Sequence, residues 1–163
     1  MIIEIFTGRV IKILKGILVV VLAVFLFLQI KQPSNSGTDF QTVVDVTLKE
    51  KNLDEFKQGD NLAIKRFLGM NPEEFESIVY YKNTDTMKAS EVVIVKFKDN
   101  KQSSVFKDAM KSRIENQKNV FGGYIEEEEG YLNKAVIDIQ ANYALYAVGE
   151  DAQTLMKQFE SAL

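Results

Sequence analysis

An apolar run close to the N-terminus limits the folds open to this chain more than any other feature. Residues 16–28 read GILVVVLAVFLFL and contain no polar side chain. A helix needs about 20 apolar residues to cross ~30 Å of hydrocarbon. Residues 11–30 supply that length if Lys12 and Lys15 extend their amines toward the headgroups. We therefore predict a transmembrane signal-anchor helix over residues 11–30, with the lipid bilayer as its partner.

The basic residues around this run predict its orientation. Arg9, Lys12 and Lys15 lie at its N-terminal side, whereas Lys31 is the only charged residue between the run and Thr38. Cytoplasmic segments carry an excess of Lys and Arg, so the N-terminus is expected in the cytoplasm. The predicted location is the cell membrane, as a single-pass protein whose C-terminal domain is extracytoplasmic.

The chain divides into a tail, a span, a linker and one domain. We expect residues 1–10 to be a cytoplasmic tail, residues 31–38 a Pro/Ser/Gly-containing linker, and residues 39–163 an extracytoplasmic domain. A cleavable signal peptide, with Ser34 and Ser36 near the cut, is the alternative. Against cleavage, the apolar run exceeds a usual signal sequence and no A-x-A pattern follows it.

Hydrophobic periodicity predicts an α+β domain after residue 38. Apolar residues recur at helical spacing in some segments and alternate in others. The predicted helices cover residues 39–51, 61–68, 99–121 and 152–163, and the predicted strands cover residues 78–81, 91–97, 135–139 and 143–147. Strand-strand-helix thus occurs twice. We expect a two-layer domain with a four-stranded antiparallel sheet and helices on one face.

Residues at the ends of these segments predict where the helices begin and end. Asp39 and Asp99 suit N-caps, and Gln102 would complete a capping box with Asp99. Gly69 suits a left-handed position after the second helix. Leu155 belongs to the apolar stripe of the last helix and is predicted to be buried in the core.

Composition removes several kinds of chemistry. The chain has no cysteine and no histidine, so thiolate nucleophiles, Cys-ligated zinc and the usual general base near neutral pH are excluded. Its net charge is −3, without a basic stripe, which argues against nucleic acid as a partner. No phosphate loop, nucleophile elbow or metal-spaced cluster appears. We therefore assign no catalytic residue, metal site or cofactor.

Charged residues form two weak candidate sites. Residues 126–129 are four consecutive glutamates, but a calcium loop alternates its ligands around a glycine, so we interpret them as a solvated loop. Lys107, Lys111 and Lys118 fall near one side of the long helix, with Arg113 close by, and could face acidic cell-wall polymers or lipid headgroups. Nearby acidic residues favour an ordinary solvated helix surface instead.

Six tyrosines form a third candidate. An aromatic surface could recognise a glycan or a peptide, but we expect these residues mainly to fill the face and edges of the sheet. They are Tyr80, Tyr81, Tyr124, Tyr131, Tyr143 and Tyr146.

Several segments together resemble a domain-of-unknown-function family from Gram-positive bacteria. They are Gly69–Phe75 (GMNPEEF), Ser90–Asp99, Ser112–Glu115 (SRIE), Asn142–Tyr143 and Gly149–Ala152 (GEDA). The resemblance covers residues 39–163. It implies an exported, membrane-tethered protein and supplies no activity or catalytic residue. Members of that family are commonly tethered by a lipidated cysteine, which this chain lacks, so the resemblance implies anchoring by the apolar helix itself.

These observations lead to three functional hypotheses. The leading one is a non-catalytic interaction or scaffold module of the cell envelope, whose partner is another envelope protein or a cell-wall component. The alternative is a small-ligand-binding or carboxylate-dependent hydrolytic domain, which two acids converging in a closed pocket would favour. Assembly through the membrane helix is the weakest, because Gly16 and Ala23 are too far apart to form a G-x-x-x-G face.

Overall fold

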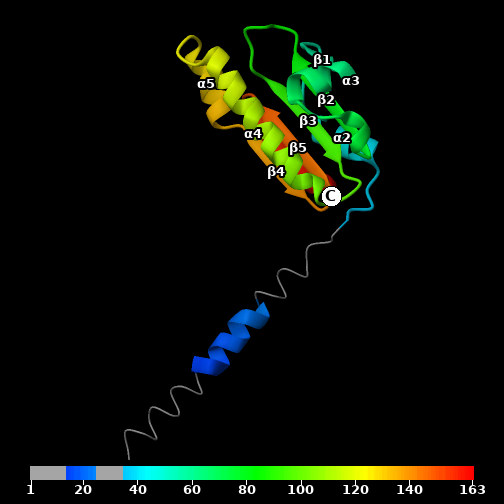
Figure 1. Ribbon diagram of the computed structural model, residues 1–163, viewed down its shortest axis with the longest axis vertical. Helices are drawn as coiled ribbons and strands as arrows, with labels where there is room; N and C mark the ends of the chain where they lie inside the picture. Colours follow the sequence, from blue (N-terminus) through cyan, green and yellow to red (C-terminus); the bar gives the residue numbers. More distant parts are fainter. Residues whose placement is uncertain (1–13, 25–34) are drawn as a thin grey trace, which may run out of the picture. The chain divides into compact units, whose positions relative to one another are not determined.

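The computed structural model describes residues 14–24 and 35–163 of the chain (Figure 1). Residues 14–24 are helical, and residues 35–163 form a compact unit of their own. No helix within these two ranges is long and apolar enough to cross a membrane. This finding corrects the fold-class prediction, which began with a transmembrane helix over residues 11–30. Residues 11–13 and 25–30 of that predicted span lie outside the described residues.

The centre of the domain is a five-stranded antiparallel sheet, not the predicted four-stranded one. Its strand order is β1-β2-β3-β5-β4. The strands are β1 (Phe56–Gln58), β2 (Ser77–Asn83), β3 (Glu91–Lys96), β4 (Val136–Gln140) and β5 (Tyr143–Val148). Sequence periodicity predicted β2 to β5 and missed β1, a three-residue edge strand.

Helices cover both faces of the sheet, so the prediction of helices on one face is wrong. The apolar cluster on one face joins α2 (Phe40–Thr47) and α6 (Ala152–Ala162) to the strands, and Leu155 lies within it as predicted. The cluster on the other face includes residues of η1 and α4. The helical segments on that side are α3 (Asn61–Ala63), the π-helix η1 (Ile64–Leu68), the 3-10 helix η2 (Pro72–Glu74), α4 (Gln102–Phe121) and α5 (Glu126–Asn133). Figure 1 shows α4 lying across β4 and β5.

The composition of β3 and β5 explains why the sheet is covered on both sides. Residues 92–95 of β3 and 143–148 of β5 are all fully buried. Val93 and Val95 face the α4 side, whereas Val92 and Ile94 face α2 and α6. A strand that is apolar at every position has two faces to remove from water, which requires a layer on each side. The result is a three-layer domain.

Several predicted helix ends are confirmed. Asp39 accepts hydrogen bonds from the backbone N–H groups of residues 41 and 42 at the start of α2. Gly69 has φ +66° after η1, as its position suggested. Asp99 does not cap α4 directly, because that helix begins at Gln102. The Gln102 side chain nevertheless accepts hydrogen bonds from the backbone N–H groups of Lys98 and Asp99, at 2.9 and 3.3 Å.

Candidate functional site

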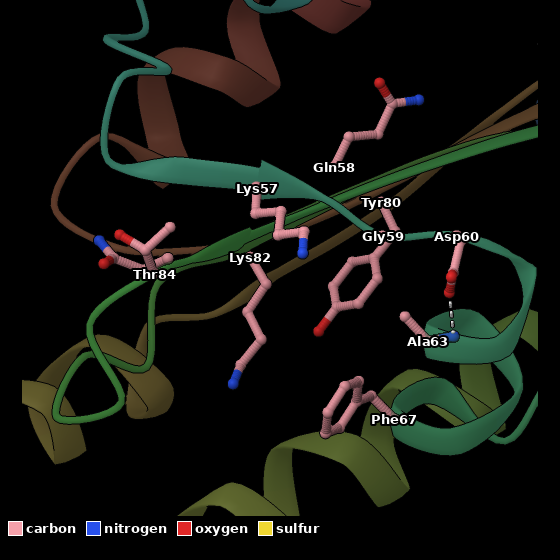
Figure 2. A pocket seen from close by; sticks show the side chains of 10 residues that line it. Lys57, Gln58, Gly59, Asp60, Ala63, Phe67, Tyr80, Lys82 and Thr84 are labelled. Carbon is pink, nitrogen blue, oxygen red and sulfur yellow. Dashed lines mark hydrogen bonds between the residues drawn. The ribbon is translucent and has the colours of Figure 1, made fainter.

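A pocket of about 400 Å³ lies between the β1–β2 pair and the helical segment after β1. We call it the β1–β2 pocket. Figure 2 shows Lys57, Lys82 and Tyr80 extending from the strands to the same side, toward Phe67, while Gln58 points away. Small-molecule sites span roughly 300–1,000 Å³. The pocket can therefore accept a small ligand or one group of a larger partner.

Gly59 and Asp60 shape this pocket where β1 ends. The N–H of Gly59 donates to the carbonyl of Tyr80 at 2.8 Å, and a Cβ at position 59 would lie 2.7 Å from Cδ1 of that ring. Glycine thus lets the tyrosine ring lie against the backbone. Asp60 accepts a hydrogen bond from the N–H of Ala63 at 2.8 Å and begins α3. The chain then continues into η1, a π-helix of the kind that often occurs at functional sites, which carries Phe67 to the pocket.

Two lysines face each other across the strands that form this pocket. Lys57 on β1 pairs directly with Lys82 on β2 in the sheet register. Like charges opposite each other destabilise an antiparallel pair. Neither ammonium group forms an ion pair or hydrogen bond with a carboxylate among residues 14–24 and 35–163. Asp60, the one carboxylate among the described residues that lines the pocket, caps α3 with Oδ1 and forms no ion pair with either lysine. The pocket thus holds two lysines that have no ion-pair partner in the described part of the chain.

Three cationic side chains lie close to the ring of Phe67, which lines the pocket. The Lys82 Nζ atom lies 5.1 Å from the centroid of the Phe67 ring, and the Cζ atoms of Arg66 and Arg113 lie 5.4 and 5.7 Å from it. A cation near an aromatic face is attracted by the ring quadrupole. The ring therefore helps to hold these cationic groups at the pocket.

Beside the pocket, three side chains converge on the fully buried carboxylate of Glu91. Arg113 donates from Nε to Oε1 and from Nη2 to Oε2, both at 2.9 Å. The hydroxyls of Tyr80 and Tyr146 donate to Oε2 and Oε1 at 2.8 and 3.0 Å. Although Glu91 lies opposite Lys82 in the sheet register, its oxygens are occupied by these four charge-assisted hydrogen bonds. We call this group the Glu91 cluster.

The surroundings of the Glu91 cluster fix its protonation. Burial, together with the negative charge of Glu91, raises the pKa of Tyr80 and of Tyr146 well above 10. Burial alone lowers the pKa of Arg113, but its hydrogen bonds to Glu91 and the charge of that carboxylate outweigh burial, so the net pKa is raised. At neutral pH both phenols are therefore neutral donors and the guanidinium is charged. These two tyrosines and this arginine thus exchange no proton near neutrality and hold the structure in place.

A second pocket of about 400 Å³ is rich in carboxylates. Its lining includes Lys51 and Asp151, whose Nζ and Oδ2 atoms are 2.8 Å apart, and Lys88 and Glu128, whose Nζ and Oε1 atoms are 3.0 Å apart. In the described part of the chain, no group of three or more acidic residues is placed to hold a metal ion. The acids paired with lysines here act as structural ion pairs.

The glutamate run belongs to a helix, so the prediction of a solvated loop is wrong. Residues 126–129 form the first turn of α5, where carboxylates interact favourably with the helix dipole. Glu128 is buried, and its Oε2 accepts a hydrogen bond from the backbone N–H of Ala89 at 2.7 Å. One member of the run thus joins α5 to the loop between β2 and β3.

The four basic residues of α4 do not form a common surface. Lys107 and Lys111 are exposed, and Lys118 lies 3.8 Å from Glu115. Arg113 points inward instead and contacts Glu91. The interpretation of an ordinary helix surface holds for the three lysines, whereas Arg113 is a partly buried structural residue.

Four of the six tyrosines lie in the sheet as expected, whereas Tyr124 and Tyr131 lie outside it. Tyr80, Tyr143 and Tyr146 are fully buried in the sheet faces, which confirms that they fill the core. Tyr124 is 88% exposed and lies between α4 and α5. No shared aromatic surface unites them.

Sequence reasoning missed the residues that define the candidate site. Lys57 lies in a segment to which no element was assigned, so its pairing with Lys82 could not be foreseen. Glu91 did leave a signal, because it is a charged residue at the start of the otherwise apolar run Val92–Val95. A carboxylate in a strand buried on both faces requires partners. Nothing local, however, indicates Arg113 or Tyr146.

Comparison with known proteins gives one match. A family model described as Domain of unknown function (DUF4358) matches residues 49–149. No match was found among curated proteins or among solved structures. The matched range holds the β1–β2 pocket and the Glu91 cluster, whereas α2 and α6 lie outside it. Since the match covers more than half of the chain, this protein belongs to the DUF4358 family of domains of unknown function.

Proposed function

We propose that residues 39–163 form a non-catalytic binding module that recognises an acidic group in the β1–β2 pocket. The partner carrying this group is a component of the cell envelope, either another protein or a wall component. The observation that carries the proposal is the pairing of Lys57 with Lys82 without a carboxylate to compensate them. A local arrangement that costs stability is typical of a functional site.

The composition of the pocket favours binding over hydrolysis. Carboxylate-dependent hydrolysis uses two acids placed around the bond to be cleaved. Asp60 is the acid that lines the β1–β2 pocket, and it caps α3. The oxygens of Glu91, the nearest buried acid in the register, are held by Arg113 and two tyrosines. These contacts leave lysines and an aromatic ring to meet a ligand, which supports recognition.

A location on the outer face of the membrane completes the proposal and rests on the sequence alone. The apolar residues 16–28 and the basic residues Arg9, Lys12 and Lys15 support association of residues 11–30 with the bilayer and export of the rest. Because the chain has no cysteine, Ser161→Cys supplies a unique label. A membrane-impermeant maleimide should label it on intact cells. The matched variant Thr7→Cys should be labelled only after lysis, and the opposite pattern would overturn this location.

Titration with simple anions tests the binding function. Calorimetric titration of the full-length protein with phosphate, N-acetylglutamate amide and glucuronate should reveal binding of at least one anion that weakens as salt is raised. Lys57→Gln and Lys82→Gln should each weaken it about tenfold or more, because a hydrogen bond to a charged group contributes ~1.5–3 kcal/mol. Lys107→Gln, an exposed lysine on α4, is the control and should have no effect. Equal affinities for all three variants would refute the proposal.

A further inference from the structure

The sheet ends in two edge strands that differ in how well they are protected. β1, at one border, has three residues, and Lys57 and Gln58 on it are exposed. β4, at the other border, has five residues and contains no proline, no lysine and no bulge in its pairing with β5. Short length, lysine, proline and bulges protect edge strands, because an unprotected edge accepts a further strand. β1 has two of these four devices, whereas β4 has none of them.

The backbone direction of β4 follows from the neighbouring strand pairs. In an antiparallel pair, residues whose N–H and C=O groups face the partner alternate with residues whose groups face away. The N–H of Phe97 donates to the carbonyl of Asn142 at 2.8 Å, so the even-numbered residues of β5 bond toward β3. The odd-numbered residues of β5 therefore bond to residues 136, 138 and 140 of β4. Consequently, the N–H and C=O groups of Ile137 and Ile139 point away from β5.

These outward groups are available to a further strand. The N–H and C=O groups of Ile137 and Ile139 have no hydrogen-bond partner among residues 14–24 and 35–163. Burying a backbone polar group unpaired costs free energy, so such groups are almost always solvated. β4 is the last strand of the sheet, and residues 137–140 are all partly exposed, in agreement with an edge that solvent reaches. α4 and α6 contact the two faces of β4 and leave this edge to solvent.

The side chains of β4 indicate which strand fits this edge. Ile137 and Ile139 pack against the core on the α4 side and are only partly buried, so they can also contact apolar side chains of an added strand. Asp138 lies between them and projects from the opposite face of the sheet. Gln140 donates to Asp138 at 3.2 Å, but no cation in the described part of the chain pairs with this carboxylate. An opposite charge across the strands would stabilise the pair, whereas a second aspartate there would repel it.

We propose that the free edge of β4 binds an extended segment of a partner protein as an additional strand, with a basic residue opposite Asp138 and apolar residues opposite Ile137 and Ile139. The outward N–H and C=O groups then exchange hydrogen bonds with the two apolar residues of the segment. In strand addition, such main-chain bonds supply affinity and the alternate side chains supply specificity. The site lies at the border of the sheet opposite to the β1–β2 pocket and functions without it.

N-methylation of a peptide tests the alternation that strand addition requires. The probe is the fluorescein-labelled peptide amide Thr-Val-Lys-Val-Thr, titrated with the full-length protein and followed by fluorescence anisotropy. With lysine opposite Asp138, both valine N–H groups donate to β4 and the lysine N–H points to solvent. N-methylation of either valine should weaken binding about twofold to tenfold, the effect of one lost net hydrogen bond. N-methylation of the lysine is the matched control and should change the affinity little.

Variants of β4 test the charge and the edge separately. Asp138→Asn should weaken binding of the lysine peptide about twofold to fivefold and remove its preference over Thr-Val-Glu-Val-Thr. Asp108→Asn, at an exposed aspartate of α4, is the matched control and should have no effect. Ile139→Pro removes an outward N–H and should abolish binding while the fold is kept, because an edge strand tolerates proline where the N–H faces solvent. If the melting curve shows that this variant is unfolded, Asp138→Asn and the methylated peptides decide.

The outcomes distinguish the possible occupants of the edge. Bound peptide should protect the amide hydrogens of Ile137 and Ile139 from exchange with solvent. Equal weakening by methylation at all three positions, or at none, would refute strand addition, and so would the absence of binding at millimolar peptide. If the wild type self-associates, Ile139→Pro does not and the peptide fails to bind, a second copy occupies the edge and the proposed partner is wrong. Loss of anion binding in Lys57→Gln or Lys82→Gln concerns only the β1–β2 pocket, so the two proposals fail separately.

Discussion

Replacing Glu91 by glutamine tests the energetic role of the Glu91 cluster. The substitution keeps the volume of the side chain and removes its charge. An amide nitrogen at either oxygen position would face the donor groups of Arg113 at 2.9 Å. The tyrosine hydroxyls can rotate to accept, but a guanidinium has only donors. One charge-assisted contact is therefore lost outright, and a buried guanidinium loses its counter-ion.

The expected loss is a large part of the total stability. Breaking a buried ion pair from one side costs ~3–5 kcal/mol, against a total of ~5–15 kcal/mol for an ordinary domain. We expect Glu91→Gln to lower the free energy of unfolding by ~3–5 kcal/mol and the melting temperature by about 10–20 °C. Because Glu91 is 0% exposed, solvent does not weaken its interaction with Arg113.

Chemical denaturation of a double-mutant cycle measures this contribution. The four proteins are the wild type, Glu91→Gln, Arg113→Met and the double variant, and unfolding is followed by circular dichroism. Because each single variant leaves one group unpaired and the double variant leaves neither, the double variant should be less destabilised than the two losses added together. A loss below ~1 kcal/mol for Glu91→Gln would refute the view that the buried pair is dry and tightly held. Additive losses would show that the two groups act independently.

Four further predictions follow from other parts of the domain. Leu155→Asp places an unpaired carboxylate at a position that is 1% exposed and should unfold the domain, so an unchanged melting curve would contradict the core assignment. Ala141 has φ +53° in the two-residue turn between β4 and β5. Ala141→Gly should raise the free energy of unfolding by ~0.5–1 kcal/mol in urea titrations, since relief of ~1–2 kcal/mol of backbone strain exceeds the added unfolded-chain entropy. Lys57→Glu converts a like-charge pair with Lys82 into an opposite-charge pair. It should raise the free energy of unfolding by ~0.5–1 kcal/mol at low salt and abolish anion binding. Burial and the negative charge of Glu91 raise the pKa of Tyr146. The contribution of Tyr146 to the free energy of unfolding is therefore complete below pH ~10, and it falls by ~1.4 kcal/mol per pH unit as the pH rises further. Above pH ~10, the free energy of unfolding of Tyr146→Phe should therefore fall less steeply with pH, by that slope. The same pH dependence in variant and wild type would contradict the raised pKa of Tyr146.

Secondary structure with a clear period could be predicted from the sequence. The segments that became β2 to β5, α4 and α6 show alternation or helical spacing over many residues, and they were predicted with the correct type. β1 was missed because three residues, FKQ, carry no period. The glutamates of α5 suggested solvent exposure, but one of them, Glu128, is buried beside Lys88. Local pattern does not reveal such a partner.

The number of layers and the candidate site depended on information that local pattern does not contain. Alternation in residues 93, 95 and 97 suggested one buried face, although residues 92 and 94 are also apolar and require a second one. The partners of Glu91 are 11, 22 and 55 residues away along the chain. Only the fold brings them together, and the same holds for the lysine pair on β1 and β2.

The convergence on Glu91 has a consequence for how the domain assembles. Its four hydrogen bonds come from β2, β5 and α4, while the carboxylate itself is on β3. A partly assembled intermediate in which any of these elements is missing would carry an incompletely solvated charge in its interior, which is costly at low dielectric. Such intermediates should be sparsely populated, so the central strands and the long helix should exchange their amide hydrogens together, in one global opening.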